Sequence, residues 1–110
     1  MEAATEFSCV LVTAPNITTA RKLAAAVLNE KLAACANLIP KIESHYWWKG
    51  ALESSAEVLI LFKTKREKLK PLEACILQNH PYETAECIAF NLSDGTPNYL
   101  AWIAESVKGK

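Results

Sequence analysis

The chain has 110 residues, of which 51% are hydrophobic, and its 12 basic and 12 acidic side chains give a formal net charge of zero. This length fits one domain, and the apolar content excludes a disordered chain. A chain without net charge has no general attraction to nucleic acid or to an acidic membrane surface, so we expect neither as a partner. We therefore treat residues 1–110 as a single domain, with residues 1–5 expected to be flexible.

The four cysteines each lie in an apolar run and form no C-x-x-C pair: Cys9, Cys35, Cys75 and Cys87. Zinc and redox motifs need closely spaced pairs, so we expect buried, reduced thiols and a reducing compartment. The segment 1–6 lacks the pattern of a signal peptide, and no apolar run reaches the roughly 20 residues of a membrane span. The sequence thus predicts a cytoplasmic protein.

The first half of the chain predicts a strand, a helix and a long hairpin. Residues 7–13 are short, apolar and rich in strand formers. Asn16 is a suitable N-cap for a helix of about four turns, because apolar residues recur at helical spacing from Ile17 onward. Residues 34–48 form a long strand that Pro40 interrupts, where we expect a bulge or bend. Lys49-Gly50 then marks the hairpin turn before a strand over residues 52–64.

The second half predicts a helix, a strand and a short terminal helix. Residues 64–67 have the spacing of a capping box, so a helix is expected to follow and to run to about Asn79. Pro71 does not fit the interior of that helix, which therefore either starts close to Pro71 or kinks there. Residues 86–92 predict a fourth strand, and after a turn at 94–97 the apolar spacing indicates a last helix.

The order β-α-β-β-α-β plus a helix predicts an α+β, ferredoxin-like split β-α-β fold with two helices on one face of an antiparallel sheet. The other face of such a sheet meets water, so its strands should alternate apolar and polar residues. Here they do not: Leu59 and Leu61 oppose Val58, Ile60 and Phe62 on the third strand. An uncovered apolar face favours aggregation, so we expect another copy of the chain to cover it.

Several motifs resemble the CutA divalent-cation tolerance family, in order and spacing: V-T-A-P (12–15), L-A-A-C-A-N-L-I-P (32–40), Y-W-W-K-G (46–50), K-T (63–64), H-P-Y-E (80–83) and Y-L-A-W-I (99–103). The resemblance implies a ferredoxin-like protomer in a tight homotrimer, similar in architecture to the PII signalling trimers. It also implies a link to copper tolerance, and no established enzymatic reaction. We accordingly expect no required cofactor and no enzyme.

The resemblance also bears on metal binding. The copper ligands proposed for a bacterial member are a cysteine before T-A-P and two successive histidines before P-Y. This chain has Val12 and Asn79-His80 there, so only His80 remains. A transition metal ion needs several convergent nitrogen or sulfur donors. A divalent cation such as copper is therefore expected to bind weakly, if it binds, and through His80; the alternative is a histidine held by hydrogen bonds in a turn.

The candidate ligand site is a cleft between subunits, lined by six residues: Tyr46, Trp48, Lys63, His80, Tyr82 and Glu86. Lys63 needs solvent or a carboxylate, so it either pairs with Glu83 or Glu86 or binds an anion. Tyr46 and Trp48 share a strand face and suit an interface or a ligand wall. Three functions remain open: a trimeric binding or signalling module with a small-ligand or protein partner, a direct weak copper binder, and an uncharacterised enzyme. No nucleophile with a nearby base supports the last.

Overall fold

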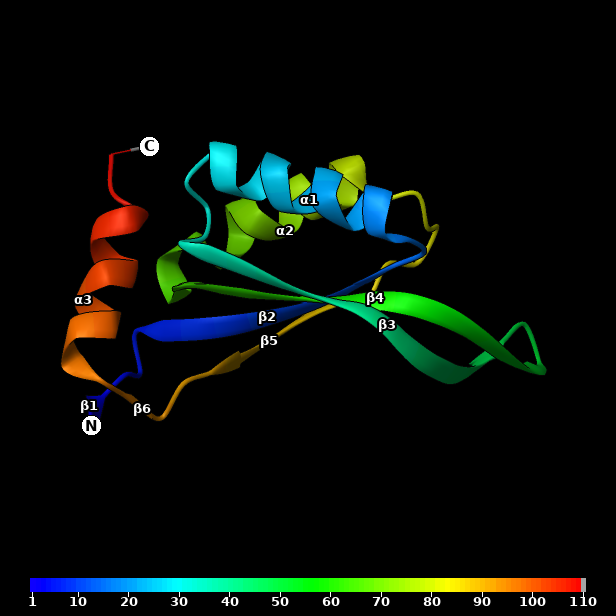
Figure 1. Ribbon diagram of the computed structural model, residues 1–110, viewed down its shortest axis with the longest axis horizontal. Helices are drawn as coiled ribbons and strands as arrows, with labels where there is room; N and C mark the ends of the chain where they lie inside the picture. The colour runs from blue at the N-terminus through cyan, green and yellow to red at the C-terminus, as the bar shows by residue number, and fades with distance from the viewer. Residues whose placement is uncertain (110) are drawn as a thin grey trace.

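A four-stranded antiparallel sheet carries two helices on one face in the computed structural model, which describes residues 1–109 (Figure 1). The strands lie in the order β3-β4-β2-β5, so the first strand of the motif is central and the hairpin occupies one side. The sheet and its helices consist of β2 (Phe7–Ala14), α1 (Ile17–Asn29), β3 (Cys35–Trp48), β4 (Ala51–Lys65), α2 (Leu69–Asn79) and β5 (Cys87–Asn91). The predicted ferredoxin-like α+β fold is confirmed.

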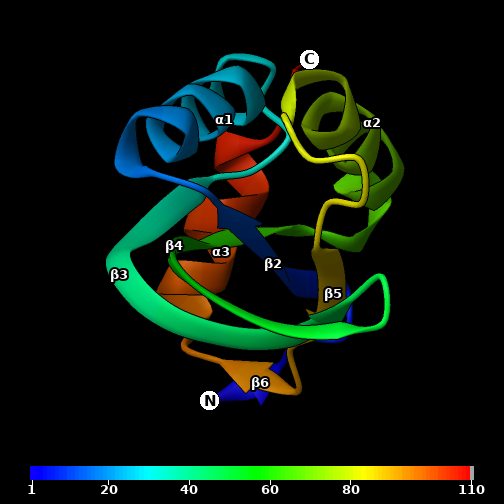
Figure 2. The ribbon, with the colours of Figure 1, turned by 90° about the vertical axis from the view of Figure 1, so that its right-hand side faces the viewer.

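Helix α1 begins as the sequence predicts. The side chain of Asn16 accepts a hydrogen bond from the backbone N–H of Thr19 at 2.8 Å, which satisfies one of the free donors of the first turn. Its apolar residues face the sheet, and Leu23 and Val27 are fully buried. In Figure 2, α1 and α2 lie side by side above the sheet and enclose the core.

The predicted capping box before α2 is wrong. Strand β4 continues to Lys65, and the Thr64 hydroxyl is buried and donates to the carbonyl of Leu32 at 2.6 Å instead of capping a helix. A 3₁₀ turn (η1, Arg66–Lys68) then leads into α2 at Leu69. Pro71 lies in the first helical turn, where a missing N–H costs nothing. Of the two alternatives, the helix that starts close to Pro71 is confirmed.

The β3-β4 hairpin has the predicted bulge and turn. The pairing register shifts between Ile39 and Ile42, around Pro40. At the turn, Lys49 and Gly50 have φ angles of 49° and 80°, the left-handed conformations of a tight hairpin connection. The strands are 14 and 15 residues long, and the hairpin projects beyond the helices (Figure 1).

The N-terminal segment and the segment before α3 meet at the opposite end of the sheet. Strand β1 (Glu2–Ala3) pairs with β6 (Asp94–Gly95), the segment predicted as a turn, and Ala4 is buried. The flexibility expected for residues 1–5 concerns motion and stays a prediction. Helix α3 (Pro97–Ser106) packs across this end of the sheet (Figure 1).

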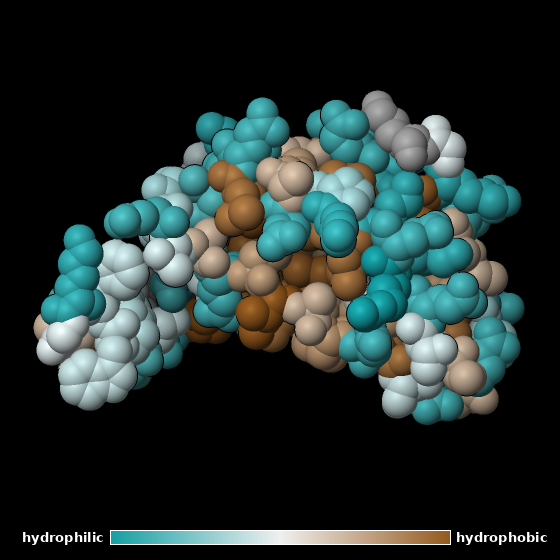
Figure 3. All heavy atoms as spheres, turned by 180° about the vertical axis from the view of Figure 1, so that it is seen from behind, coloured by the Kyte–Doolittle hydropathy of each residue, from teal (hydrophilic) through white to brown (hydrophobic). Residues whose placement is uncertain are grey.

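The sheet therefore has two unequal faces. Val10, Val12, Ile60 and Phe62 point toward the helices and are buried. The opposite face carries the apolar residues Leu11, Leu59 and Leu61 together with the polar Asn37 and Lys63, and Ile88 and Phe90 on β5 stay 55% and 50% exposed. We call this second face the open face. Figure 3 shows hydrophobic residues gathered beneath the helices, above a hollow between the hairpin and the α3 end.

Candidate functional site

His80 holds the segment after α2 against the end of β2. Its Nε2 donates to the carbonyl of Thr13 at 2.7 Å, and its Nδ1 accepts from the backbone N–H of Tyr82 at 3.1 Å. Because a carbonyl only accepts and an N–H only donates, these contacts fix a neutral ring with its proton on Nε2. Both ring nitrogens are thus used inside the chain, as in a turn-fixing histidine.

The turn fixed by His80 places Tyr82 on a buried carboxylate. The Tyr82 hydroxyl donates to Oε2 of Glu57 at 2.9 Å, and its ring lies 4.8 Å from that of His80. Glu57 is only 8% exposed. Burial, followed by the hydrogen bond to Glu57 and its charge, raises the pKa of Tyr82 to about 12. The phenol therefore remains a hydrogen-bond donor at neutral pH.

Tyr46 completes this arrangement from the neighbouring strand. Its hydroxyl shares a hydrogen bond of 3.1 Å with Oγ of Ser55, two residues from Glu57 on β4. Tyr46 also contributes to the raised pKa of Tyr82, after burial and the interactions with Glu57. We call these five residues the hairpin-root cluster: Tyr46, Ser55, Glu57, His80 and Tyr82.

Lys63 lies outside the cluster. Its ammonium donates to Oδ1 of Asn37 on β3, and among residues 1–109 it forms no ion pair with a carboxylate. His80 contacts Thr13, which pairs with Leu59 on β4. Lys63 lies four residues beyond Leu59 along the same strand, so roughly 13 Å separate the backbone positions of Leu59 and Lys63. The predicted ion pair with Glu83 or Glu86 is absent from the described part of the chain.

The other two predicted site residues are also separate from the cluster. Glu86 precedes β5 and is exposed, with no hydrogen bond or ion pair to the cluster within residues 1–109. Trp48 lies at the hairpin tip, where the Lys49 ammonium approaches its ring centroid at 5.6 Å. The structure thus brings together Tyr46, His80 and Tyr82 within one chain.

The three positions at which the family resemblance implies copper ligands do not converge here. Val12 is fully buried in the core beneath the helices, and the Asn79 amide donates to the carbonyl of Cys75 at 2.8 Å. Within residues 1–109, no three His, Cys, Asp or Glu side chains gather closely enough to hold a metal ion. His80 therefore stands without partner ligands from its own described chain.

All four cysteines are free thiols, and only Cys9 is buried, the other three being half-buried. Burial raises the pKa of Cys9, while the nearby Lys63 ammonium opposes that shift. Burial likewise raises the pKa of Cys75 and of Cys87. The thiols of Cys9, Cys75 and Cys87 are therefore protonated at neutral pH, which makes them weak nucleophiles.

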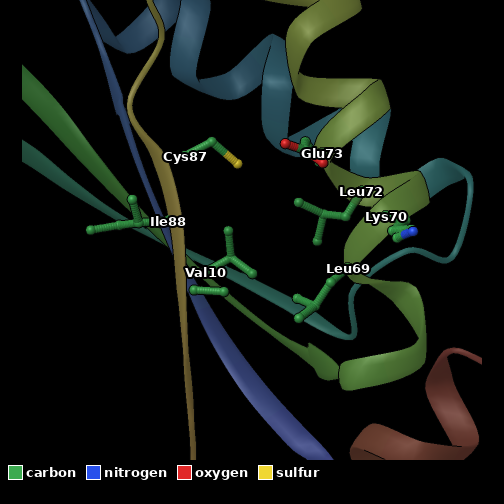
Figure 4. Close-up of a pocket in the computed structure, with 8 residues that line it drawn as sticks. Val10, Leu69, Lys70, Leu72, Glu73, Cys87 and Ile88 are labelled. Atoms are coloured by element: carbon green, nitrogen blue, oxygen red, sulfur yellow. The ribbon is translucent and has the colours of Figure 1, made fainter.

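A separate cavity of about 190 Å³ lies between α2 and β5. Figure 4 shows the side chains of Leu69, Leu72 and Cys87 pointing into the space between the helix and the strand. Its charged residues, Lys70 and Glu73, are exposed, and it lacks the convergent polar groups that orient a ligand. The hairpin-root cluster is therefore the better candidate site.

Sequence reasoning missed Glu57 and Ser55. A signal for Glu57 was present, because it is a charged residue at the start of the apolar run E-V-L-I-L-F and shares a strand face with Leu59. A carboxylate within an apolar run of a strand lies in a poorly solvated environment. It therefore needs a hydrogen-bond donor or a cation as a partner. Tyr82 could not be identified as that partner before the turn after α2 was placed.

Fold and site together define a class: a small ferredoxin-like α+β protein with a projecting hairpin and a polar cluster at its root. The family model described as CutA1 divalent ion tolerance protein matches residues 8–106. The chain therefore belongs to the CutA1 divalent ion tolerance family.

Named relatives support this assignment. A "Divalent-cation tolerance protein CutA" from Yersinia pestis (strain Pestoides F) is 45% identical over 98 residues, covering 89% of this chain and 82% of that protein. The "Protein CutA homolog" of Xenopus laevis is 43% identical over 100 residues, or 91% of this chain. This chain spans 54% to 66% of the length of the vertebrate and plant relatives it matches.

Solved structures agree with the fold. The crystal structure of CutA1 from Oryza sativa superposes with a TM-score of 0.92 at 37% identity, covering 99% of this chain and 100% of that one. The protein described as periplasmic divalent cation tolerance protein CutA from Archaeoglobus fulgidus gives a TM-score of 0.90 at 32% identity, covering 93% and 99%. In this chain, no helix within residues 1–109 is long and apolar enough to cross a membrane.

Proposed function

We propose that the protein is a homotrimeric binding or signalling module in the response to divalent metal ions such as copper, and that it is not an enzyme. The observation that carries this proposal is the position of the hairpin-root cluster beside an uncovered apolar sheet face. The names of the relatives, divalent-cation tolerance proteins, supply the physiological context.

The open face supports self-assembly. Ile88 and Phe90 are at least half exposed, and Ile88 lies in one row with Leu11 and Leu61, because Leu11 pairs with both of them. Burying one such side chain stabilises an assembly by roughly 1.5–3 kcal/mol. Three copies that cover one another's open faces bury several such side chains, and the stabilisation of the assembly is correspondingly larger. Helix α3 covers one end of this face, where Tyr99 lies beside Cys35, while Ile88 and Phe90 stay exposed.

The hairpin supports a ligand cleft between subunits. It projects beyond the helices and carries Trp47, 72% exposed, near its tip (Figure 1). An isolated two-stranded ribbon is marginally stable in water, so a neighbouring subunit is expected to pack against it. This places Tyr46 and Trp48 of one subunit next to a neighbour, with the hairpin-root cluster at the base of the cleft.

We place the protein in the cytoplasm because its four cysteines are free thiols, which a reducing compartment preserves. Direct weak copper binding through His80 is the alternative function. It requires a partner ligand from another subunit and the loss of one of the two hydrogen bonds of the imidazole. We therefore favour the binding or signalling module.

Light scattering combined with copper titration calorimetry tests the proposal. We expect a mass of three 12.1-kDa chains at micromolar concentration, with weak copper binding. A stable monomer would overturn the proposal. A trimer with submicromolar copper affinity would instead establish the direct metal-binding function.

A further inference from the structure

We propose that the hairpin-root cluster binds an organic ammonium group, with the Glu57 carboxylate as its counter-ion and the rings of Tyr46 and Tyr82 as its walls. This inference deepens the proposed function and rests on it for the role of the cluster. Within residues 1–109 the Glu57 carboxylate has no cationic partner.

Glu57 has too few partners for a buried carboxylate. Glu57 is only 8% exposed. Its one side-chain hydrogen bond in the described chain comes from the neutral phenol of Tyr82. An ionised carboxylate has about four acceptor positions, and burying it without a cation is costly. None of the three ion pairs within residues 1–109 involves Glu57.

The cationic groups of the hairpin do not pair with Glu57 in the described chain. Lys41, which precedes Glu57's pairing partner Ile42, is exposed and forms no ion pair with it. The Lys63 ammonium donates to Asn37, and the Lys49 ammonium lies over Trp48 at the hairpin tip. His80 is neutral in its observed arrangement, because Nδ1 accepts and Nε2 donates. No cation within residues 1–109 pairs with Glu57, and we infer that a bound cation is its partner.

The surroundings of Glu57 select the kind of cation. Tyr46 and Tyr82 are 41% and 37% exposed, so their rings are accessible beside the buried carboxylate. Aromatic faces attract ammonium groups, and a carboxylate among aromatic rings is a common means of recognising them. The Ser55 hydroxyl, already bonded to Tyr46, offers a further acceptor for an N–H donor.

A metal ion fits this cluster less well. Calcium takes six to eight oxygen ligands, usually with several carboxylates, and copper prefers nitrogen and sulfur donors. The cluster has one carboxylate and neutral hydroxyls, while both nitrogens of His80 are engaged. An organic ammonium group needs only one counter-charge and ring faces, which the cluster provides.

The test uses choline and its uncharged analogue of the same shape, 3,3-dimethylbutan-1-ol, titrated into the assembled protein and followed by calorimetry and by tyrosine NMR signals. A primary amine, propylammonium, is titrated in parallel. We expect choline or propylammonium to bind and the neutral analogue to bind at least about tenfold more weakly, since the charged contact is lost. Equal binding of choline and the alcohol would overturn the inference.

Matched variants locate the site. Glu57→Gln is expected to weaken ammonium binding about tenfold or more, whereas Glu53→Gln, an exposed acid on the same strand face, should change it less than about twofold. If Glu57→Gln does not fold, Tyr46→Leu at an exposed position should weaken binding and Tyr46→Phe should preserve it. Equal losses from Glu53→Gln and Glu57→Gln would contradict the assignment.

The outcomes separate this inference from the proposed function. A trimer that binds no ammonium probe, or a trimer in which a neighbour's lysine or arginine contacts Glu57, overturns the inference alone. A monomer that binds choline through Glu57 overturns the proposed trimeric module and leaves the ammonium site established.

Discussion

His80 connects three parts of the fold through one neutral ring. It ties the end of β2 to the turn after α2, and that turn carries Tyr82 to Glu57 on β4. A histidine with two such partners positions other groups and is poorly available to a metal ion. Its main contribution is therefore the geometry of the hairpin-root cluster.

Replacing His80 should destabilise the protein measurably. His80→Ala leaves the Thr13 carbonyl and the Tyr82 N–H without their partner, which costs about 1–3 kcal/mol of unfolding free energy. The matched control is His45→Ala, because His45 bonds Glu43 at an exposed position and should change stability by less than about 0.5 kcal/mol. Urea denaturation measures both, and equal stabilities would show that the His80 contacts contribute nothing.

Copper binding should be weak and should depend on His80. A copper ion must displace the Thr13 carbonyl or the Tyr82 N–H from the ring, and no third ligand converges on it within the described chain. Calorimetry on the wild type and on His80→Ala measures the effect. Submicromolar affinity that survives the substitution would place a copper site elsewhere in the protein.

The contact between Tyr82 and Glu57 predicts a pH dependence at high pH. The pKa of Tyr82 is raised from its ordinary value of 10.0 to about 12 in the fold, so the protonated phenol stabilises the folded state. That contribution is complete below about pH 10 and is lost as the pH rises through about 12. In Tyr82→Phe, the loss of unfolding free energy between about pH 10 and pH 12 that comes from this phenol should disappear.

Phenolate absorbance checks the same assignment directly. Of the three tyrosines, Tyr99 also has a raised pKa, chiefly through burial, so two late-titrating groups are expected. Tyr82→Phe should remove one of them and cost about 1–3 kcal/mol, because Glu57 loses its bond. Tyr46→Phe should leave both late groups in place. A wild type in which Tyr82 and Tyr99 titrate near pH 10 would contradict the prediction.

At the scale of elements, the hairpin determines which side chains share the cluster. From the turn, Trp48 pairs with Ala51, and this register holds until the bulge at Pro40 shifts it by one residue. Beyond the bulge Asn37 pairs with Leu61, which puts Asn37 on the same face as Lys63 and explains their hydrogen bond. Without the shift, Asn37 would face the core.

This register explains what the sequence could and could not predict. Strands and helices were identified because their apolar spacing is local, and Asn16 caps α1 as its residue type predicts. The partner of Lys63 depends on the size of the bulge, which a proline alone does not specify. Thr64 matched a capping box by spacing, but burial in β4 directed its hydroxyl to Leu32.

The hairpin turn should be sensitive to Gly50. Its φ of 80° is left-handed, and a Cβ at this position would meet no atom within 4 Å, so the effect of Gly50→Ala is one of backbone strain. We expect a loss of about 1–2 kcal/mol in unfolding free energy, measured by urea denaturation. Gly109→Ala, with a similar φ of 79° outside the sheet, is the control and should cost less. An unchanged stability for Gly50→Ala would mean that the turn adopts another conformation.

For the whole molecule, the central feature is a sheet that is apolar on both faces. Adjacent apolar residues such as Leu59 and Ile60 predict this, and in the single chain α1 and α2 bury one face while Ile88 and Phe90 on the other stay at least half exposed. The number of copies that cover the open face depends on the angle at which the copies meet. The trimer therefore remains a proposal that mutation can test.

Ile88→Lys is expected to break the assembly while the protomer still folds. Ile88 is 55% exposed in the single chain, so a lysine there costs the isolated fold little, but within a desolvated contact an unpaired charge costs several kcal/mol. Leu77→Lys is the matched control, since Leu77 is 57% exposed on α2, away from the open face. Trp48→Asp tests the hairpin contact in the same way. Light scattering and circular dichroism should show a smaller or aggregated species for Ile88→Lys and Trp48→Asp, and an unchanged trimer for Leu77→Lys. An intact trimer in Ile88→Lys would mean that the open face faces water, and the case for self-assembly would then fail.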